Sequence, residues 1–306
     1  MTDYAPVYRF GKQLQTRHPE DFGEPDAFRI FQNARASKGV LSRRPGEALL
    51  AVGGTSHGAL NFAPGSSETL NIPIPTGGGV WVLPLRFSLR MVFKQDDNPA
   101  GNEYLLGYAG AGVGGLTLRL NSSRNVVAVF TDSAATSTTL TSSTALTAGT
   151  AYSVMVTRST STLKLWVNNT AEATDTGVSA TLLGRTPTAN VTIAGHNAAD
   201  YFDGDIDNLL LLQTCLADNA DGFLRCADPM AEDVLACYTM EQTANAHVTD
   251  WSRYGNTALA VNTPTTATAL CVQDSVVTGM APFTTASGQK KVLVQTGGKV
   301  YGTDLT

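Results

Sequence analysis

Alternation of apolar and polar residues over short segments is the feature that most limits how this chain can fold. The segment AYSVMVTRSTSTLKLWVNN, residues 151–169, contains two such runs separated by Ser159–Ser161. In a strand, every second side chain lies on the same face. The apolar face of this pair consists of Tyr152, Val154, Val156, Leu163, Leu165 and Val167. The pattern predicts a β-hairpin with one buried face.

Similar runs recur through the middle of the chain. RFSLRMVFK, residues 86–94, alternates in the same way, and residues 103–130 read as three strands separated by Gly-rich and Asn-Ser-Ser turns. The only helix signal is a short turn that Asp218 or Asn219 could cap, ending before Pro229. A series of short strands with turn signals predicts an all-β, two-sheet antiparallel sandwich.

The texture of the sequence divides the chain into three parts. Residues 1–65 carry much of the charge and little periodicity, which predicts an arm that gains order by packing on a partner. Residues 66–262 form the predicted sandwich. Residues 263–306 end in KKVLVQTGGKVYGTDL, which predicts a C-terminal β-hairpin across a Gly-Gly turn.

Composition excludes several functions. Charged residues make up 15% of the 306 residues and the net charge is -5, so there is no basic field for nucleic acid. The N-terminus is polar, and no apolar run approaches the length of about 20 residues that a membrane span needs. We therefore expect a protein that is made in a cytoplasm, stays soluble and is not inserted into a membrane.

The four cysteines do not form a zinc-binding pattern. Cys215, Cys226, Cys237 and Cys271 include no C-x-x-C pair and have no matched histidines nearby. They are predicted to be buried thiols.

Asp203, Asp205 and Asp207 stand at alternate positions just before four leucines, so they could bind a cation, act as catalytic carboxylates or edge a strand. An EF-hand counted from Asp203 would need Gly and Glu where Asn208 and Thr214 stand. Calcium in another geometry stays open as an alternative. The interpretation we favour places Asp203 and Asp205 in a solvated turn, with Asp207 accepting backbone N–H bonds at a strand start.

Catalytic patterns are missing. A glycosidase needs two facing carboxylates, and none of Glu103, Glu172, Glu232 and Glu241 alternates with an Asp along a strand. Ser56 and His57 lack the spacing of a nucleophile motif, and His196 is interpreted as a polar residue at a strand end. The chain is therefore predicted not to be an enzyme, with no catalytic, cofactor-binding or metal-binding residues.

Two further patterns suggest binding. Gly110, Gly112 and Gly115 are spaced much as in a nucleotide-binding loop, but no helix follows to hold a phosphate. Tryptophans at three positions could form a sugar-stacking platform, with Trp166 exposed, although a core role for at least two of them is favoured. These residues are Trp81, Trp166 and Trp251.

The order of these segments resembles the laminin-G-like, concanavalin-A-like jelly roll. The similar segments are residues 152–158, 163–169 and FDGDIDNL at 202–209. A further element of that family, with the pattern D-x-S-x-x-G-N, is matched by Asp250, Ser252, Gly255 and Asn256, but it comes last here and often opens such domains. The resemblance implies a jelly-roll fold and a binding role for glycans, proteins or calcium.

The ends of the chain resemble podophage tail-nozzle proteins. The similarity lies in FQNARASKGVLSRRPGEALLAV, residues 31–52, and in VLVQTGGKVYGTDL near the C-terminus. The Arg43-Arg44-Pro45-Gly46 stretch can equally be an ordinary solvated Pro-Gly turn.

Together these features predict a non-enzymatic structural protein of a bacteriophage virion, located in the tail or head–tail region. Its partners would be other virion proteins, copies of itself and host-surface glycans, without a cofactor. The alternatives are a stand-alone carbohydrate-binding protein and a glycan hydrolase.

Overall fold

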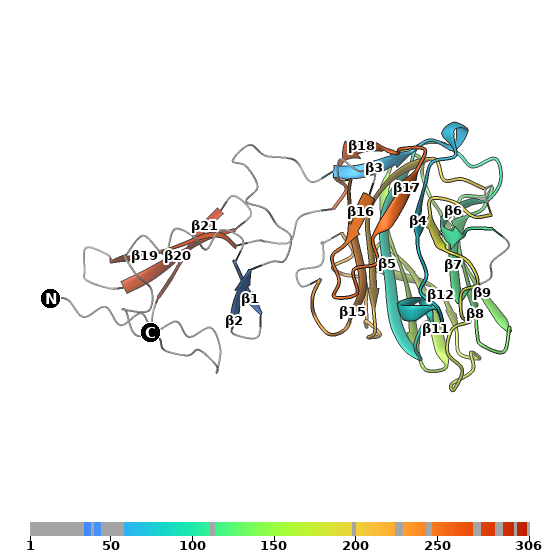
Figure 1. Cartoon of the computed structure of the whole chain (residues 1–306), viewed down its shortest axis with the longest axis horizontal. Helices are drawn as coiled ribbons and strands as arrows, with labels where there is room; N and C mark the ends of the chain where they lie inside the picture. The colour runs from blue at the N-terminus through green and yellow to red at the C-terminus, as the bar shows by residue number, and fades with distance from the viewer. Residues whose placement is uncertain are drawn as a thin grey trace. The chain divides into compact units, whose positions relative to one another are not determined.

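A computed structural model gives the architecture of the chain (Figure 1). It describes residues 34–37, 40–43, 58–110, 114–197, 200–223, 229–242, 247–271, 277–284, 290–296 and 299–304. The chain divides into two compact units. One unit is Ser56–Val272, and the other combines Met1–Thr55 with Gln273–Thr306.

In its described residues, the unit Ser56–Val272 consists of strands and two short 3₁₀ turns. The turns are η3 (Pro64–Ser66) and η4 (Gly79–Trp81). The strands are β3 (Gly58–Phe62), β4 (Thr69–Ile72), β5 (Arg86–Gln95), β6 (Glu103–Tyr108), β7 (Leu116–Leu120), β8 (Asn125–Thr131), β9 (Ser137–Ala145), β10 (Ala151–Ser159), β11 (Thr162–Val167), β12 (Thr170–Asp175), β13 (Val191–Ile193), β14 (Gly204–Leu212), β15 (Val234–Gln242), β16 (His247–Asp250), β17 (Ala258–Val261) and β18 (Thr265–Thr268).

The strands build the predicted sandwich. All pairings are antiparallel, and the hydrogen-bonded order is β12-β11-β10-β5-β14-β15-β16-β17-β4-β13-β6-β7-β8-β9. One continuous core cluster contains side chains from β5, β10, β11 and β14 together with side chains from β4, β6, β7, β8 and β13. The path therefore folds over on itself and closes two layers around one core, which confirms the all-β jelly-roll prediction.

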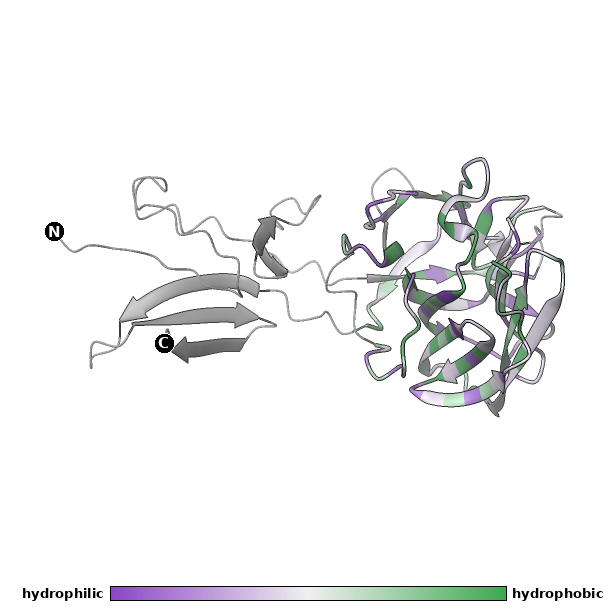
Figure 2. Cartoon of the chain, turned by 90° about the horizontal axis from the view of Figure 1, so that it is seen from below, coloured by the Kyte–Doolittle hydropathy of each residue, from purple (hydrophilic) through white to green (hydrophobic). Residues whose placement is uncertain are grey.

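The hairpin predicted at residues 151–169 is confirmed in register. Val154 lies opposite Val167 and Val156 opposite Leu165, and the two strands join at Ser159 and Thr162. All four of these apolar side chains lie in the core. The alternating face of residues 86–94 packs against the same core through Phe87, Leu89, Met91 and Phe93. Figure 2 shows apolar and polar bands alternating along the strands.

Strand β14 contains a bulge at Asp207, followed by a run of leucines that is buried on both faces. Ile206 pairs with Phe93 and Asn208 pairs with Val92, so Asp207 is the extra residue. Before the bulge Ile206 faces the core, and after it Leu209 and Leu211 do so. The alternate leucines, Leu210 and Leu212, pack on the other face in a second cluster with Val234 and Cys237. Both faces of the strand are covered, which requires apolar residues at successive positions.

The sandwich extends about ten residues beyond the predicted 66–262 at each end. β3 lies in the segment assigned to the N-terminal arm, yet it pairs with β14, and Leu60 and Phe62 are fully buried. β18, which was assigned to the C-terminal segment, pairs with β3. The local pattern did not show this, because the partners of β3 and β18 are far away in the sequence.

The other unit contains short strands from both ends of the chain. β1 (Ala34–Ser37) and β2 (Val40–Arg43) form a hairpin. β19 (Val277–Thr284), β20 (Lys290–Thr296) and β21 (Lys299–Asp304) form a three-stranded antiparallel sheet. Thr296 pairs with Lys299, as expected for a hairpin across Gly297-Gly298.

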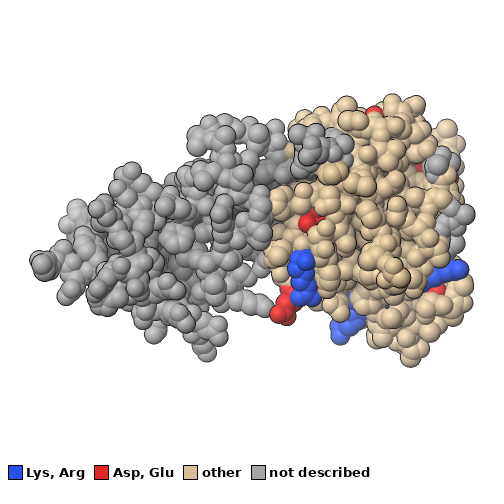
Figure 3. Space-filling model, in the orientation of Figure 1, with Lys and Arg blue, Asp and Glu red and all other residues tan. Residues whose placement is uncertain are grey.

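Charge on the jelly roll is sparse. On the face shown in Figure 3, acidic and basic side chains are few and scattered among uncharged ones. In the part of the chain that the structure describes, no helix has the length and apolar character needed to span a membrane.

Candidate functional site

A buried carboxylate organises the turn that follows β16. Asp250 Oδ1 accepts the backbone N–H groups of Cys237 at 3.0 Å and Ser252 at 2.9 Å. Its Oδ2 accepts the Ser252 hydroxyl at 2.9 Å and the Asn256 N–H at 3.0 Å. Four hydrogen bonds to one carboxylate fix the path of residues 250–256.

Tyr238 and Gly255 complete this turn. Burial raises the pKa of Tyr238, with Asp250 acting in the same direction, so the phenol stays protonated. Its hydroxyl donates to the carbonyl oxygen of Asn256 at 2.5 Å. Gly255 has φ +62°, a left-handed conformation that glycine adopts without strain. The D-x-S-x-x-G-N pattern is thus a rigid turn.

This turn presents an aromatic side chain to solvent. Tyr254 is 43% exposed, whereas Tyr108 and Tyr238 in the core are at most 1% exposed. The guanidinium of Arg253 lies 5.1 Å from the Tyr254 ring centroid and donates to its hydroxyl at 3.1 Å. One residue of the turn is therefore held in a fixed place with much of its ring uncovered.

Tyr254 lines a shallow pocket of about 360 Å³ at one end of the sandwich. The wall opposite Tyr254 comes from the segment before β5 and is mainly apolar. It consists of Pro75, Gly79, Val80, Val82 and Pro84. Leu235, Gln213 and Asn256 complete the lining. The pocket joins segments that lie far apart in the sequence.

The polar groups of the pocket are uncharged. Within the described residues, the side-chain amides of Gln213 and Asn256 have no hydrogen-bond partner, so both can bond a ligand. Tyr254 is the one titratable side chain in the lining, and no carboxylate pair is present there. An aromatic ring, two amides and an apolar wall suit binding of a polyhydroxylated ligand better than acid–base chemistry.

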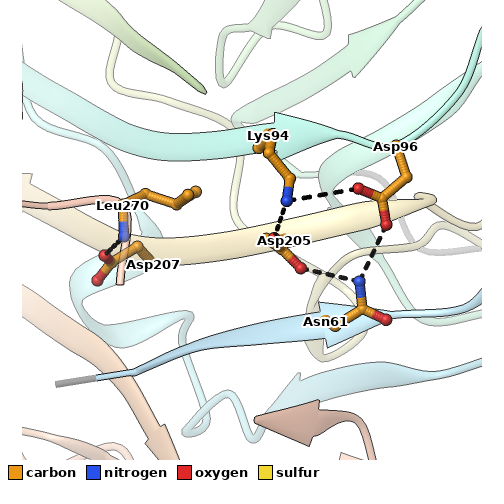
Figure 4. A network of polar contacts seen from close by, with 6 residues as sticks. All are labelled: Asn61, Lys94, Asp96, Asp205, Asp207 and Leu270. Atoms are coloured by element: carbon orange, nitrogen blue, oxygen red, sulfur yellow. Dashed lines mark hydrogen bonds and ion pairs between the residues drawn. The ribbon is translucent and has the colours of Figure 1, made fainter. Parts of the chain in front are cut away.

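The Asp203–Asp207 triplet lies outside this pocket, and its members have different environments. Figure 4 shows the contacts of Asp205 and Asp207. Asp205 is 4% exposed; its carboxylate pairs with Lys94 Nζ and accepts the Asn61 amide at 2.8 Å. The prediction of a solvated turn is wrong for Asp205, because Lys94 and Asn61 from the two flanking strands meet it. Asp203 precedes β14 and is half-buried.

Asp207 does accept backbone N–H groups, as predicted, but from within the strand. Its Oδ2 bonds the N–H groups of Leu270 and Cys271 at 2.5 Å each. At the bulge, this side chain is directed toward Leu270 and Cys271, the last described residues in the sequence of the jelly-roll unit. Among the described residues, no group of three or more His, Cys, Asp or Glu side chains is arranged to hold a metal ion. The expectation of no cofactor stays a prediction.

The glutamates have different environments. Burial raises the pKa of Glu103 to about 7; hydrogen bonds from the Asp203 backbone and the Gln95 side chain oppose this shift, and the charges of Asp97 and Asp203 add to it. Glu172 accepts hydrogen bonds from the backbone and hydroxyl groups of Ser143 and Thr144, and these hold its pKa below the ordinary value. Glu232 is exposed, and the side chain of Glu241 lies outside the described residues.

Comparison with protein families agrees with this architecture. The model described as the concanavalin A-like lectin/glucanases superfamily matches residues 67–219, which is half of the chain. The chain belongs to this superfamily. The resemblance to the laminin-G-like, concanavalin-A-like jelly roll is thereby confirmed, whereas the resemblance of the chain ends to tail-nozzle proteins is not tested by this match.

Several solved structures are similar to this concanavalin-like chain at low sequence identity, and the first of them shares its fold. A Bacteroides ovatus protein, itself proposed to bind carbohydrate, has a TM-score of 0.54 and 16% identity, covering 70% of this chain and 60% of its own. The CBM40 module of a Ruminococcus gnavus sialidase, bound to α2,3 sialyllactose, has a TM-score of 0.39 and 15% identity, covering 52% and 91%. Domains LG4-5 of the mouse laminin α1 chain have a TM-score of 0.41 and 18% identity, covering 53% and 42%. No curated protein sequence matches the chain.

The tryptophans of this concanavalin-like sandwich do not form a platform. Trp81 is a core residue, and Trp251 packs against the small cluster outside β14. The prediction that Trp166 is exposed is wrong. It is 8% exposed, its indole N–H donates to Thr157 Oγ1 at 3.1 Å, and Lys164 Nζ lies 5.6 Å from its ring.

The remaining predicted candidates lie elsewhere. Ser56, His57, Gly112 and Cys226 are outside the described residues. Cys237 and Cys271 are buried thiols, as predicted, and Cys215 is half-buried. Gly110 and Gly115 flank the link between strands β6 and β7. His196 follows β13, at a strand end as predicted.

Sequence reasoning missed Tyr254, Gln213 and the wall formed by residues 75–84. The D-x-S-x-x-G-N pattern contains a signal for Tyr254. It marks a turn, and a side chain at a variable position of a turn can reach solvent. The opposite wall left no local signal.

Proposed function

We propose that this chain is a non-enzymatic glycan-binding protein that holds a sugar residue in the pocket at Tyr254. The observation that carries the proposal is the exposed ring of Tyr254 beside the amides of Gln213 and Asn256, which have no hydrogen-bond partner among the residues that the structure describes, over an apolar wall. A sugar ring offers C–H groups to an aromatic face and hydroxyl groups to amides. Membership of a superfamily that includes lectins supports the proposal.

The absence of catalysis is part of the same proposal. A glycosidase needs one proton-donating carboxyl and a second carboxylate across the scissile bond. Neither lines the pocket. Glu103, whose raised pKa would suit a general acid, lies on β6 and accepts a hydrogen bond from Gln95 at the end of β5, whereas the pocket wall ends at Pro84, before β5 begins. A hydrolase would therefore have to act through Glu103, away from Tyr254.

We place this binding module on a bacteriophage virion, in the tail or head–tail region. The segments that resemble tail-nozzle proteins fall in the unit formed by both ends of the chain, outside the jelly roll. That arrangement suits an attachment unit with a binding domain inserted between its halves. The partners would be other virion proteins and further copies of the chain, and many copies would strengthen weak sugar contacts through avidity.

A glycan array with the labelled full chain tests the sugar-binding proposal. We expect selective binding, weakened about tenfold in Tyr254→Ala, because the change removes the stacking surface. Tyr254→Phe keeps the ring and should retain binding. Leu259→Ala changes another exposed apolar residue, 42% exposed on β17, and is the matched control. An array without signal for the folded wild type would refute the proposal.

The attachment role is tested by the size of the full chain in solution. Light scattering should show self-association that rises with concentration. A monomer at every concentration, with residues 1–55 resistant to protease, would contradict it.

A further inference from the structure

A second cluster of polar side chains lies on the solvent-facing side of the other sheet. Tyr104 on β6 is opposite Arg119 on β7, and His196 follows the neighbouring strand β13. The rings of His196 and Tyr104 are stacked, with centroids 4.4 Å apart and an interplanar angle of 20°. All three side chains are half-buried, so each keeps some contact with solvent.

The backbone holds this cluster in place. The His196 Nδ1 atom accepts the N–H of Tyr108 at 3.1 Å. Gly107 leaves the space for this contact, because a Cβ there would lie 2.8 Å from the Cβ of His196 and 2.9 Å from its Nδ1. Burial lowers the pKa of His196, so its ring is neutral at pH 7, with Nδ1 as acceptor. A glycine and a backbone donor thus hold one half-buried ring in place.

Arg119 has unused hydrogen-bonding capacity. Its Nη1 donates to the Tyr104 hydroxyl at 3.3 Å, and its Cζ lies 5.6 Å from the Tyr104 ring centroid. Its Nε is buried and has no acceptor. In the described part of the chain no carboxylate forms an ion pair with Arg119. A guanidinium that is fixed by a neighbour but lacks an anion matches the two oxygens of a carboxylate.

We propose that Arg119, Tyr104 and His196 form a second ligand site, which binds the carboxylate of an acidic sugar residue. The guanidinium takes the carboxylate through its remaining N–H groups, and the stacked rings contact the sugar. None of these residues lines the pocket at Tyr254, so this site stands or fails independently of the proposed function.

The experiment compares matched acidic and neutral ligands on the full chain by titration calorimetry. Tetragalacturonate is set against its methyl ester, and sialyllactose against lactose, so that the two arms separate hexuronates from nine-carbon acidic sugars. At least one acidic ligand should bind at least tenfold more tightly than its neutral partner. Arg119→Gln should abolish that difference, because a charge-assisted pair is lost.

Two other variants control for folding and for non-specific charge. Arg124→Gln removes a cation from the β7–β8 turn and should leave binding within twofold. Asp200, exposed beside His196, places a negative charge near the site, so Asp200→Asn should tighten acidic binding two- to threefold. Tyr254→Ala should leave the acidic preference intact.

The proposal is overturned if neither acidic ligand outbinds its neutral partner, or if Arg119→Gln and Arg124→Gln weaken binding equally. Should Arg119→Gln fail to fold, unchanged acidic binding in Asp200→Asn overturns it instead. Loss of the acidic preference in Tyr254→Ala would assign the carboxylate to the pocket and would also overturn it.

Discussion

At the scale of single residues, two glutamates of the sandwich have pKa values shifted in opposite directions. Glu103 is half-buried, and its pKa is raised to about 7 mainly by desolvation. Glu172 is more exposed, and hydrogen bonds from Ser143 and Thr144 lower its pKa. Because β12 carries Glu172 and β9 carries its donors, this carboxylate connects two edge strands of the sandwich. The two residues should therefore respond differently to pH.

The unfolding free energy of the wild type should fall as pH rises, and Glu103→Gln should not show this fall. The folded-state pKa lies above the unfolded value of 4.5, so folding favours the protonated form. The stabilisation from the protonated Glu103 carboxyl is fully present below pH 4.5 and is lost as pH rises through about 7. Allowing for partial exposure, the change is on the order of 1 kcal/mol. Urea unfolding at pH 5, 6, 7 and 8 measures it, and parallel pH profiles for wild type and variant would contradict it.

Glu172→Gln should destabilise the protein at pH 7, by at most about 1 kcal/mol because the pair is near the surface. Its folded pKa is lowered, so its contribution is present above the unfolded value of 4.5 and disappears as pH falls through the folded pKa. The difference from wild type should shrink on acidification. A difference that stays constant between pH 7 and pH 3 would show that the carboxylate charge is not responsible.

At the scale of elements, β14 is the strand through which several parts of the unit are connected. It pairs with β5, β3 and β15, and its bulge at Asp207 changes which residues face the core. The buried Asp207 carboxylate bonds two backbone N–H groups beyond β18. One carboxylate thus ties the last described residues of the unit to its centre.

Asp207→Ala should therefore cost about 2–3 kcal/mol of unfolding free energy, since the half-buried N–H of Leu270 and the buried N–H of Cys271 lose this acceptor. Asp203→Ala is the matched control from the same triplet. Burial and the nearby Asp97 and Asp96 raise the pKa of Asp203, so its removal should be neutral or slightly stabilising. Denaturant midpoints compare the two, and equal losses would contradict the roles assigned to them.

The sequence predicted elements whose evidence was local, and it failed where partners were distant. The hairpin at residues 151–169 was predicted in register, because the alternation of apolar and polar residues assigns each side chain to one face of its strand. The burial of Asp205 was not, since Lys94 and Asn61 stand more than a hundred residues earlier. Trp166 was expected to be exposed because it alternates with Leu165, but the outer face at that position is buried too. The pocket is lined by four segments that lie apart in the sequence. The sequence pattern identified one of them, the turn at residues 250–256.

At the scale of the whole molecule, the jelly roll and the unit formed by the chain ends have separate roles in this account. The jelly roll Ser56–Val272 contains the pocket, the Arg119 cluster and the core. The other unit, Met1–Thr55 with Gln273–Thr306, contains the segments on which the proposed virion role rests. The two roles can therefore be tested on different parts of the chain.

A fragment of residues 56–272 should fold with an unfolding midpoint close to that of the same unit in the full chain. A fragment of residues 66–262 should be less stable by about 4 kcal/mol or fail to fold, because it lacks the buried Leu60 and Phe62 of β3. Circular dichroism melts of both fragments measure this. Equal stability would mean that β3 and β18 are dispensable additions to the sandwich.

The most direct test of the account is a binding titration of the full chain with its best array glycan, followed by mass spectrometry of the recovered ligand. The account predicts saturable binding, a loss of about tenfold in Tyr254→Ala, and a ligand returned intact by both wild type and Glu103→Gln. A ligand cleaved by the wild type but not by Glu103→Gln, or binding unaffected by Tyr254→Ala, would contradict it.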